Sequence, residues 1–320
     1  MEHSEKTNRI QHFPVMMYAI VMGMSGLTIT YQKAHLWLGV PEIIGIILMY
    51  ITTFLFLIIS FFYVQKLFRF NSEVKKEFTH PVRINFFAAI SISIIMLSII
   101  YKEYNPLLSA TMWYPGTLLH LYLTMYTVSF WINQNQQLDH SNPAWFIPIV
   151  GNVLIPVGGA GIVSNDVLMY FFSVGMFFWF VLFSIIFNRI IFHNQLASKF
   201  MPTLFILIAP PAVGFIAYFK MFGVMDTFAT FLFNIAVFFT LLVAFMYRNF
   251  LKIKFFISWW AFVFPVAAMS IASMLLYHIK GGVLLYGFAY CMVVVTTIII
   301  GIVTYQTIKN VTFKNICVQE

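Results

Sequence analysis

Charged residues are scarce in this sequence. Only 9% of its 320 residues are Asp, Glu, Lys or Arg, whereas a soluble domain has about 25%. Hydrophobic residues make up 61%, and the mean hydropathy is +0.89. A water-soluble core could not absorb so much apolar side chain, so the composition excludes an ordinary soluble domain and indicates that lipid surrounds most of the chain.

Cysteine is also scarce, and the long apolar segments contain no acidic residue except at their ends. Cys291 and Cys317 fall in the last apolar segment and the C-terminal tail, so we expect no disulfide, metal site or other cofactor. Ion-coupled transporters usually keep ionisable groups inside the membrane, and cation pores usually use acidic rings or carbonyl filters. The sequence favours neither class. It also offers no nucleophile–base pair by spacing, so we do not expect an enzyme.

Ten apolar segments are present, and a helix needs roughly 20 apolar residues to cross a bilayer. They cover residues 12–32, 42–65, 84–101, 107–133, 144–164, 166–188, 200–219, 226–247, 256–278 and 283–307. The third is short, and we expect its flanking residues to extend it. We therefore predict an all-α integral membrane protein with ten transmembrane helices in a single domain, 1–320, and no cleavable signal peptide.

The basic residues predict the orientation of these segments. With the N-terminus in the cytoplasm, 14 of the 18 Lys and Arg residues lie inside, and the four outside are Lys33, Lys102, Lys220 and Lys280. Cytoplasmic loops of membrane proteins carry such an excess. We expect a multi-pass protein of the plasma (inner) membrane with cytoplasmic tails at about 1–11 and 308–320. This bias explains most of the +8 net charge without a nucleic-acid partner.

The ten segments alternate between two chemical types. The odd-numbered ones are richer in small and weakly polar residues, whereas the even-numbered ones are mostly bulky and apolar. The prolines well inside odd segments are Pro148, Pro156, Pro210, Pro211 and Pro265, and only Pro115 lies well inside an even one. Proline bends a helix and frees a carbonyl that protein or water must bond. We therefore predict five proline-kinked odd helices around a central pore and five even helices outside.

Several small or weakly polar residues of the odd segments are candidates for the pore lining. They are Gly23, Gly26, Ser91, Asn152 and Ala268. The alternative is that they mark close helix–helix contacts, where small residues are also common. His120 is the only histidine in the middle of a segment, an even one, and we expect it to be a hydrogen-bonded structural residue.

Residues 258–273, SWWAFVFPVAAMSIAS, place one large side chain among small ones. The stripe at helical spacing consists of Ser258, Ala261, Phe264, Ala268 and Ala272. Phe264 directly precedes Pro265 on this stripe. An ordinary packing role is the alternative, because the chain contains 38 phenylalanines.

A pore without charges inside the membrane can still conduct anions. The N-terminal ends of helix segments broken by proline carry partial positive charge. A basic cytoplasmic rim would raise the local anion concentration. An apolar constriction would then favour weakly hydrated ions, since dehydration dominates the barrier.

Four motifs carry a family resemblance over nearly the whole chain. They are EFTHPVRINFF at 77–87, PAWFIPIVGN at 143–152, APPAVG at 209–214 and WWAFVFP at 259–265. In this order on a ten-segment chain they resemble the TehA and slow-type anion channel family of tellurite-resistance and dicarboxylate transporter-like membrane proteins. One departure is Val21, which stands where some bacterial relatives have proline.

The resemblance implies a trimer with one pore inside each subunit, lined by the five odd helices. It also implies that a phenylalanine of the ninth helix plugs the pore as a gate, and the matching residue here is Phe264. We therefore expect an anion channel for small monovalent anions such as chloride and nitrate. The alternative is a carrier or exporter of four-carbon dicarboxylates or tellurite-like oxyanions, with Arg83 as the candidate cytoplasmic anion contact. A third possibility is a membrane protein whose pore is permanently shut.

Overall fold

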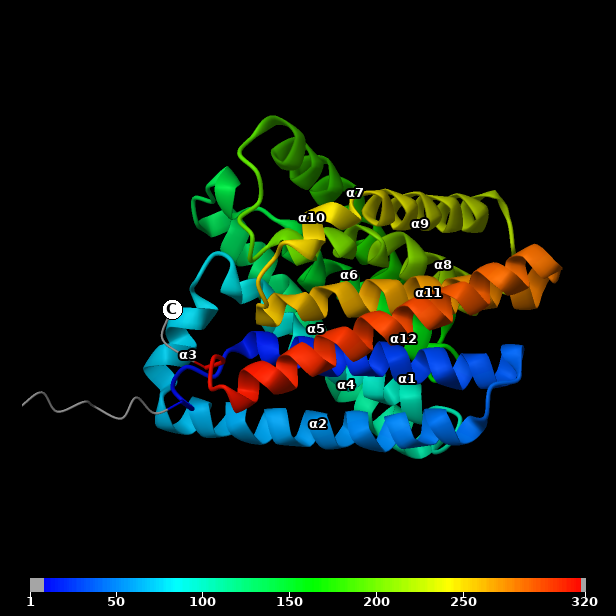
Figure 1. The fold of residues 1–320 in the computed structure, drawn as a ribbon, viewed down its shortest axis with the longest axis horizontal. Coiled ribbons are helices and arrows are strands. Elements are labelled where there is room, and N and C mark those ends of the chain that lie inside the picture. The colour runs from blue at the N-terminus through cyan, green and yellow to red at the C-terminus, as the bar shows by residue number, and fades with distance from the viewer. Residues whose placement is uncertain (1–8, 318–320) are drawn as a thin grey trace, which may run out of the picture.

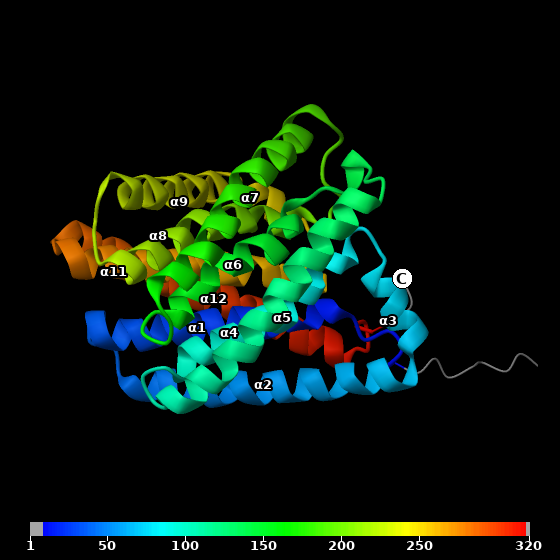
Figure 2. The ribbon, with the colours of Figure 1, turned by 180° about the vertical axis from the view of Figure 1, so that it is seen from behind.

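The computed structural model describes residues 9–317, except for the side chain of Asp139. The outer parts of both expected tails, 1–8 and 318–320, lie outside the described residues. Between residues 9 and 317 the chain is helical and contains no strand, only one isolated bridge between Ala160 and Val163. Most of the long helices run along the molecule, with α2 along one edge and α7 and α9 on the opposite side in both views (Figures 1 and 2).

The helices have the following bounds. The long ones are α1 (Tyr18–Leu38), α2 (Glu42–Arg69), α4 (Ala88–Tyr101), α5 (Pro106–Asn133), α6 (Phe146–Gly159), α7 (Asn165–Phe192), α8 (Ala209–Phe222), α9 (Thr227–Phe245), α11 (Val263–Lys280) and α12 (Val283–Thr312). The short α-helices are α3 (Asn71–Phe78) and α10 (Tyr247–Leu251). The 3-10 helices are η1 (Val15–Met17), η2 (Arg83–Phe87), η3 (Leu138–His140), η4 (Pro143–Trp145), η5 (Met201–Leu207) and η6 (Ile257–Phe262).

Seven helical segments in the described part of the chain are long and apolar enough to cross a membrane. They are α2, η2 with α4, α7, η5 with α8, α9, η6 with α11, and α12. The segment Pro143–Gly159 is apolar but shorter. The other two expected segments are the helices α1 and α5, of 21 and 28 residues, which contain more weakly polar residues. The all-helical architecture is thus confirmed, while the count of ten spans stays a prediction.

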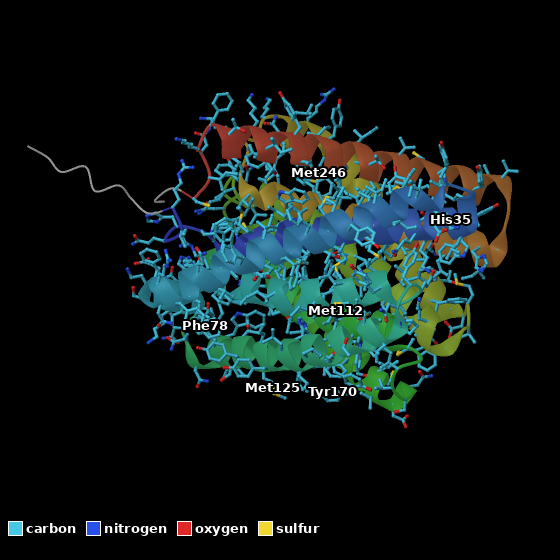
Figure 3. The ribbon with its side chains drawn as sticks, turned by 90° about the horizontal axis from the view of Figure 1, so that it is seen from below. His35, Phe78, Met112, Met125, Tyr170 and Met246 are labelled. Atoms are coloured by element: carbon cyan, nitrogen blue, oxygen red, sulfur yellow. The ribbon has the colours of Figure 1, made fainter. Side chains whose placement is uncertain are left out.

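Burial divides the long helices into two groups. In the segments of α4, α8 and α11, 78–83% of the most apolar window is buried, against 22–39% in α2, α7, α9 and α12. Most of α1 and all but one residue of α6 are also buried, whereas α5 buries only a minority of its residues. The apolar side chains of the outer group remain exposed, as expected for helices that face lipid. Met125 of α5 and Tyr170 of α7 illustrate such positions (Figure 3).

The buried helices close a ring, which we call the inner ring. Helix α1 packs against α4, α4 against α6, α6 against α8, α8 against α11, and α11 returns to α1. Each outer helix covers an inner neighbour in the chain: α2 covers α1, α5 covers α4, α7 covers α6, α9 covers α8 and α12 covers α11. This packing agrees with the expected division into odd inner and even outer segments.

Each inner helix is directly preceded by a 3-10 helix. η1 leads into α1, η2 into α4, η4 into α6, η5 into α8 and η6 into α11. Pro148, Pro210, Pro211 and Pro265 lie in the first turn of their α-helices, immediately after these 3-10 helices. Each of these prolines lacks the N–H that would bond a carbonyl of the preceding 3-10 helix, so each lies where the hydrogen-bond pattern of its segment changes.

These prolines occupy two kinds of position. Four of the five lie in the middle of an apolar segment, where its 3-10 part passes into its α part. Pro156 lies deeper inside the α-helix α6. Their role as kinks next to a pore stays a prediction.

Candidate functional site

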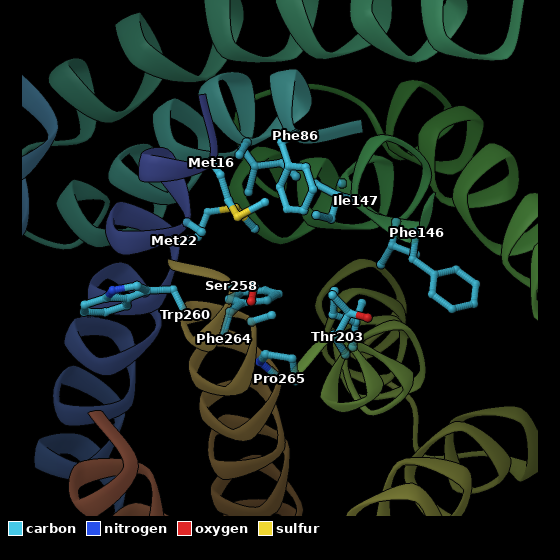
Figure 4. Close-up of a pocket in the computed structure, with 18 of the residues that line it drawn as sticks. Met16, Met22, Phe86, Phe146, Ile147, Thr203, Ser258, Trp260, Phe264 and Pro265 are labelled. Atoms are coloured by element: carbon cyan, nitrogen blue, oxygen red, sulfur yellow. The ribbon is translucent and has the colours of Figure 1, made fainter. Parts of the chain in front are cut away.

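A cavity of about 60 Å³ lies within the inner ring (Figure 4). All five inner helices or their leading 3-10 helices line it, at the level where the 3-10 parts pass into the α parts. Representative lining residues are Met16, Phe86, Val150, Thr203, Ala209 and Phe264. The lining surface is almost wholly apolar. A cavity of this size has room for a few water molecules, so a hydrated ion could pass only if the lining moved.

Phe264 is the second residue of α11 and borders this cavity together with Pro265. Its side chain is half-buried and lies across the cavity from Met16 and Phe86 (Figure 4). Gly26 of α1 lies beside it. A Cβ atom added at Gly26 would lie 3.6 Å from Cδ2 of Phe264 and 2.8 Å from Cβ of Ala267. The missing side chain of Gly26 therefore lets α1 approach α11 next to Phe264.

Phe262, two residues earlier, has a different environment. It is buried, and its phenyl group packs against those of Phe205 and Phe250, with centroids 4.6 and 5.8 Å apart. It is not among the residues that line the cavity. The two phenylalanines thus differ in position but not in chemistry, which makes Phe262 a matched control for Phe264.

Three of the candidate lining residues contact neighbouring helices instead of the cavity. A Cβ atom at Gly23 would lie 2.8 Å from both Trp260 and Val263, so Gly23 faces η6 and α11. The hydroxyl of Ser91 lies 2.9 Å from Nδ1 of His120, and the amide of Asn152 donates to a hydroxyl of α5. A buried hydroxyl or amide without a partner is costly, so both side chains turn to the outer helix α5. Ala268 is buried one turn beyond Phe264 on α11.

A buried polar cluster joins α4, α5 and α6 behind the cavity. The side chain of Asn152 donates to the hydroxyl of Thr124 at 3.0 Å, and that hydroxyl donates to the carbonyl of Pro148 at 2.8 Å. His120 is 0% exposed, and its bond to Ser91 confirms the expected hydrogen-bonded role. Gly151 lines the cavity on one side and touches His120 on the other. A Cβ atom there would lie 2.2 Å from Cε1 of the imidazole, so only glycine fits.

Arg83 begins η2 and is half-buried, but it is not part of the cavity lining. The backbone N–H groups of Val82 and Arg83 donate to Nδ1 of His80 at 3.1 and 3.3 Å. Partial burial and the nearby charges of Arg83, His140 and Lys199 lower the pKa of His80. Basic groups from several segments therefore gather at the end of the ring that we expect in the cytoplasm.

A buried ion pair at this end was not anticipated from the sequence. Nζ of Lys66 lies 2.8 Å from Oε2 of Glu77, and the two side chains are 2% and 5% exposed. Lys66 also donates to the carbonyl of Phe13 at 2.9 Å. Glu77 accepts from the hydroxyl of Tyr63 at 3.2 Å and from the N–H of Val15 at 3.4 Å. The pair thus connects α2 and α3 to η1, which carries Met16 to the cavity.

Comparisons with known proteins show which family this chain resembles. The sequence profile of the family described as voltage-dependent anion channel, SLAC1, matches residues 12–308. The S-type anion channel SLAH2 of Arabidopsis thaliana is 29% identical over 269 residues, which cover 82% of this chain and 52% of that protein. The tellurite resistance protein TehA homolog of Haemophilus influenzae is 25% identical over 93% of this chain and 91% of its own length. The chain therefore spans about half the length of the plant relative and nearly all of the bacterial one.

Proposed function

The chain belongs to the voltage-dependent anion channel (SLAC1) family, and from this membership we propose that its inner ring forms an anion pore that Phe264 closes. The channel would pass small monovalent anions such as chloride and nitrate across the plasma (inner) membrane. Its ten helices would cross the bilayer with both termini in the cytoplasm. The cavity and Phe264 would then lie toward the cytoplasmic half of the pore.

One observation carries the proposal. The cavity is bordered by all five inner helices, and Phe264 is one of the side chains that narrow it. All five helices of the closed ring border this space, so it lies on the axis of the ring. A phenyl group at this point would obstruct the axis. The small residues of the same stripe, which precede it in η6 and follow it in α11, would leave the rest of that face open.

The chemistry of the lining supports selection by dehydration. An almost wholly apolar lining offers nothing to replace the water around an ion, so weakly hydrated ions pay the smallest penalty. The edge of a phenyl group carries partial positive charge, so it does not repel an anion. A dicarboxylate would need a cationic partner along its path, and Arg83 lies outside the cavity lining. These points favour small monovalent anions over dicarboxylates.

We also propose a homotrimer in the lipid bilayer with one pore in each subunit, as the family resemblance implies. The exposed apolar side chains of the outer helices suit contact with lipid or with other subunits. Cross-linking in mild detergent should yield trimers. Monomers as the sole product would contradict this assembly.

The channel and the carrier can be separated by flux through purified protein in liposomes. We expect Phe264→Ala to pass chloride and nitrate much faster than wild type and to pass malate poorly. Phe262→Ala serves as the control because it removes the same phenyl group from a position outside the cavity. Saturable malate uptake that is lost in Arg83→Gln would favour a carrier. Absence of flux in every variant, with protein present in the membrane, would contradict the channel.

A further inference from the structure

Two side chains that lie across the cavity from Phe264 are carried by 3-10 helices. Met16 belongs to η1 and Phe86 to η2, and both border the cavity (Figure 4). Met16 is half-buried, whereas its neighbour Met17 is buried and is not among the lining residues. The space beside Phe264 therefore depends on where η1 and η2 hold these two side chains.

The buried ion pair fixes the backbone just before Met16. Nζ of Lys66 donates to the carbonyl of Phe13 at 2.9 Å. Oε1 of Glu77 accepts the N–H of Val15 at 3.4 Å, while its Oε2 accepts the Lys66 ammonium at 2.8 Å. Each partner of the pair thus makes one bond to the other and one bond to the chain that leads into Met16.

Helix α3 holds η2 as well as η1. Phe78, the last residue of α3, packs against Phe87 of η2, with centroids 4.7 Å apart. Phe87 directly follows Phe86, and η2 packs against η1. Because Glu77 and Phe78 are adjacent, this one short helix anchors both of the 3-10 helices that face Phe264.

We propose that Met16 is a second closing side chain of the pore and that Lys66 and Glu77 are the residues that position it. Apolar side chains of similar volume often replace a buried ion pair without loss of stability, so stability alone does not require charges here. The pair supplies bonds of fixed direction to the chain before Met16, which an apolar pair could not supply. The inference rests on the proposed function, because it concerns the pore that Phe264 closes.

Chloride flux in liposomes tests the closing role. Met16→Ala in the Phe264→Ala protein should raise flux several-fold above that of Phe264→Ala alone, because it removes a side chain that still narrows the cavity. Met17→Ala is the matched control, since it removes the same kind of side chain from a position outside the lining. Unchanged flux on adding Met16→Ala to a Phe264→Ala protein that conducts would overturn the closing role and leave the channel intact.

The positioning role is tested with Lys66→Met combined with Glu77→Gln, which we call the pair-free variant. It removes one of the two bonds to the chain before Met16, weakens the other and leaves no buried charge. In Phe264→Ala it should raise flux several-fold, and Met16→Ala should then add little, because both changes act through the same side chain. Glu73→Gln, which breaks the exposed ion pair of α3, is the control. Fully additive effects of the pair-free variant and Met16→Ala would overturn the positioning role.

A reporter cysteine gives a second readout that requires no conduction. It replaces Met16 or, as the control, Met24, which is buried in α1 outside the cavity lining, in a background of Cys291→Ser and Cys317→Ser. We expect a water-soluble maleimide to modify residue 16 several-fold faster in the pair-free variant than with the pair intact, and residue 24 equally slowly in both. Equal increases at residues 16 and 24 would overturn the positioning role, because they would reflect general loosening of the fold. A faster rate at residue 16 alone, with no flux in any variant, would support the positioning role and contradict the channel.

Discussion

Replacement of Glu77 by Gln should destabilise the protein far more than the same change at Glu73. Both glutamates belong to α3, and each carboxylate accepts a lysine ammonium at 2.8 Å. They differ in burial. The side chains of Lys66 and Glu77 are 2% and 5% exposed, whereas those of Lys76 and Glu73 are 72% and 26% exposed. The two pairs thus share the same N–O distance but differ in burial and in the further partners of the carboxylate.

The expected magnitude follows from what each change leaves behind. Glu77→Gln leaves the Lys66 ammonium buried without a counter-charge, and it weakens the bonds from Tyr63 and Val15. Removal of one partner from a buried ion pair costs about 3–5 kcal/mol. At about 2–4 °C per kcal/mol for a large domain, the melting temperature should fall by roughly 10 °C. In Glu73→Gln the released ammonium is hydrated, so the melting temperature should stay at the wild-type value.

Thermal denaturation in mild detergent, followed by tryptophan fluorescence, provides the assay. The double variant Lys66→Met with Glu77→Gln should be more stable than Glu77→Gln alone, because it removes the unpaired charge as well. Equal losses in Glu77→Gln and Glu73→Gln would show that burial does not set the cost of losing the carboxylate. A double variant no more stable than Glu77→Gln would show that the unpaired Lys66 ammonium is not the source of the loss.

Two further predictions concern the residues around the cavity. Gly151→Ala should lower the melting temperature, because its Cβ atom would lie 2.2 Å from His120 and overpacking costs about 1–3 kcal/mol. His120→Ala in the same protein should restore part of the lost stability. Gly287→Ala is the control, because a Cβ atom added there would have nothing within 4 Å. A Gly151→Ala protein as stable as this control would contradict the packing of Gly151 against His120. The pKa of His80 is lowered, and Nδ1 of its neutral side chain accepts two N–H groups. The neutral side chain therefore stabilises the fold above the usual histidine pKa of about 6.5, and this stabilisation is lost as the pH falls through the lowered pKa. The melting temperature of wild type should therefore fall more steeply below about pH 6 than that of His80→Asn, which keeps an acceptor but does not titrate; identical pH profiles would count against this role.

The inner and outer helices could be predicted from the sequence because burial leaves a mark on composition. A helix with protein on all sides can carry small residues such as Gly26 and Ala268. A helix that faces lipid carries mostly bulky apolar side chains, as α7 does. Composition cannot reveal the 3-10 helix before each inner α-helix. The end of the 3-10 part depends on packing between segments, and it sets the place of Pro265 within its segment.

The directions of polar side chains were also beyond the reach of the sequence. Ser91 and Asn152 turn toward α5 because His120 and Thr124 offer partners there. No periodicity within one segment contains that information. The pair of Lys66 and Glu77 was hidden for a similar reason, because the two residues lie on different helices and both stretches resemble solvated segment ends. Such contacts follow from which helices become neighbours.

Chloride flux as a function of side-chain size at residue 264 tests most directly whether Phe264 closes a pore inside the inner ring. Purified wild type, Phe264→Leu and Phe264→Ala are compared in liposomes at equal protein density, with Phe262→Ala as the control. We expect flux to increase from wild type to Phe264→Leu to Phe264→Ala, and Phe262→Ala to stay at the wild-type level. Flux that does not depend on residue 264, or that rises equally in Phe262→Ala, would contradict closure by Phe264.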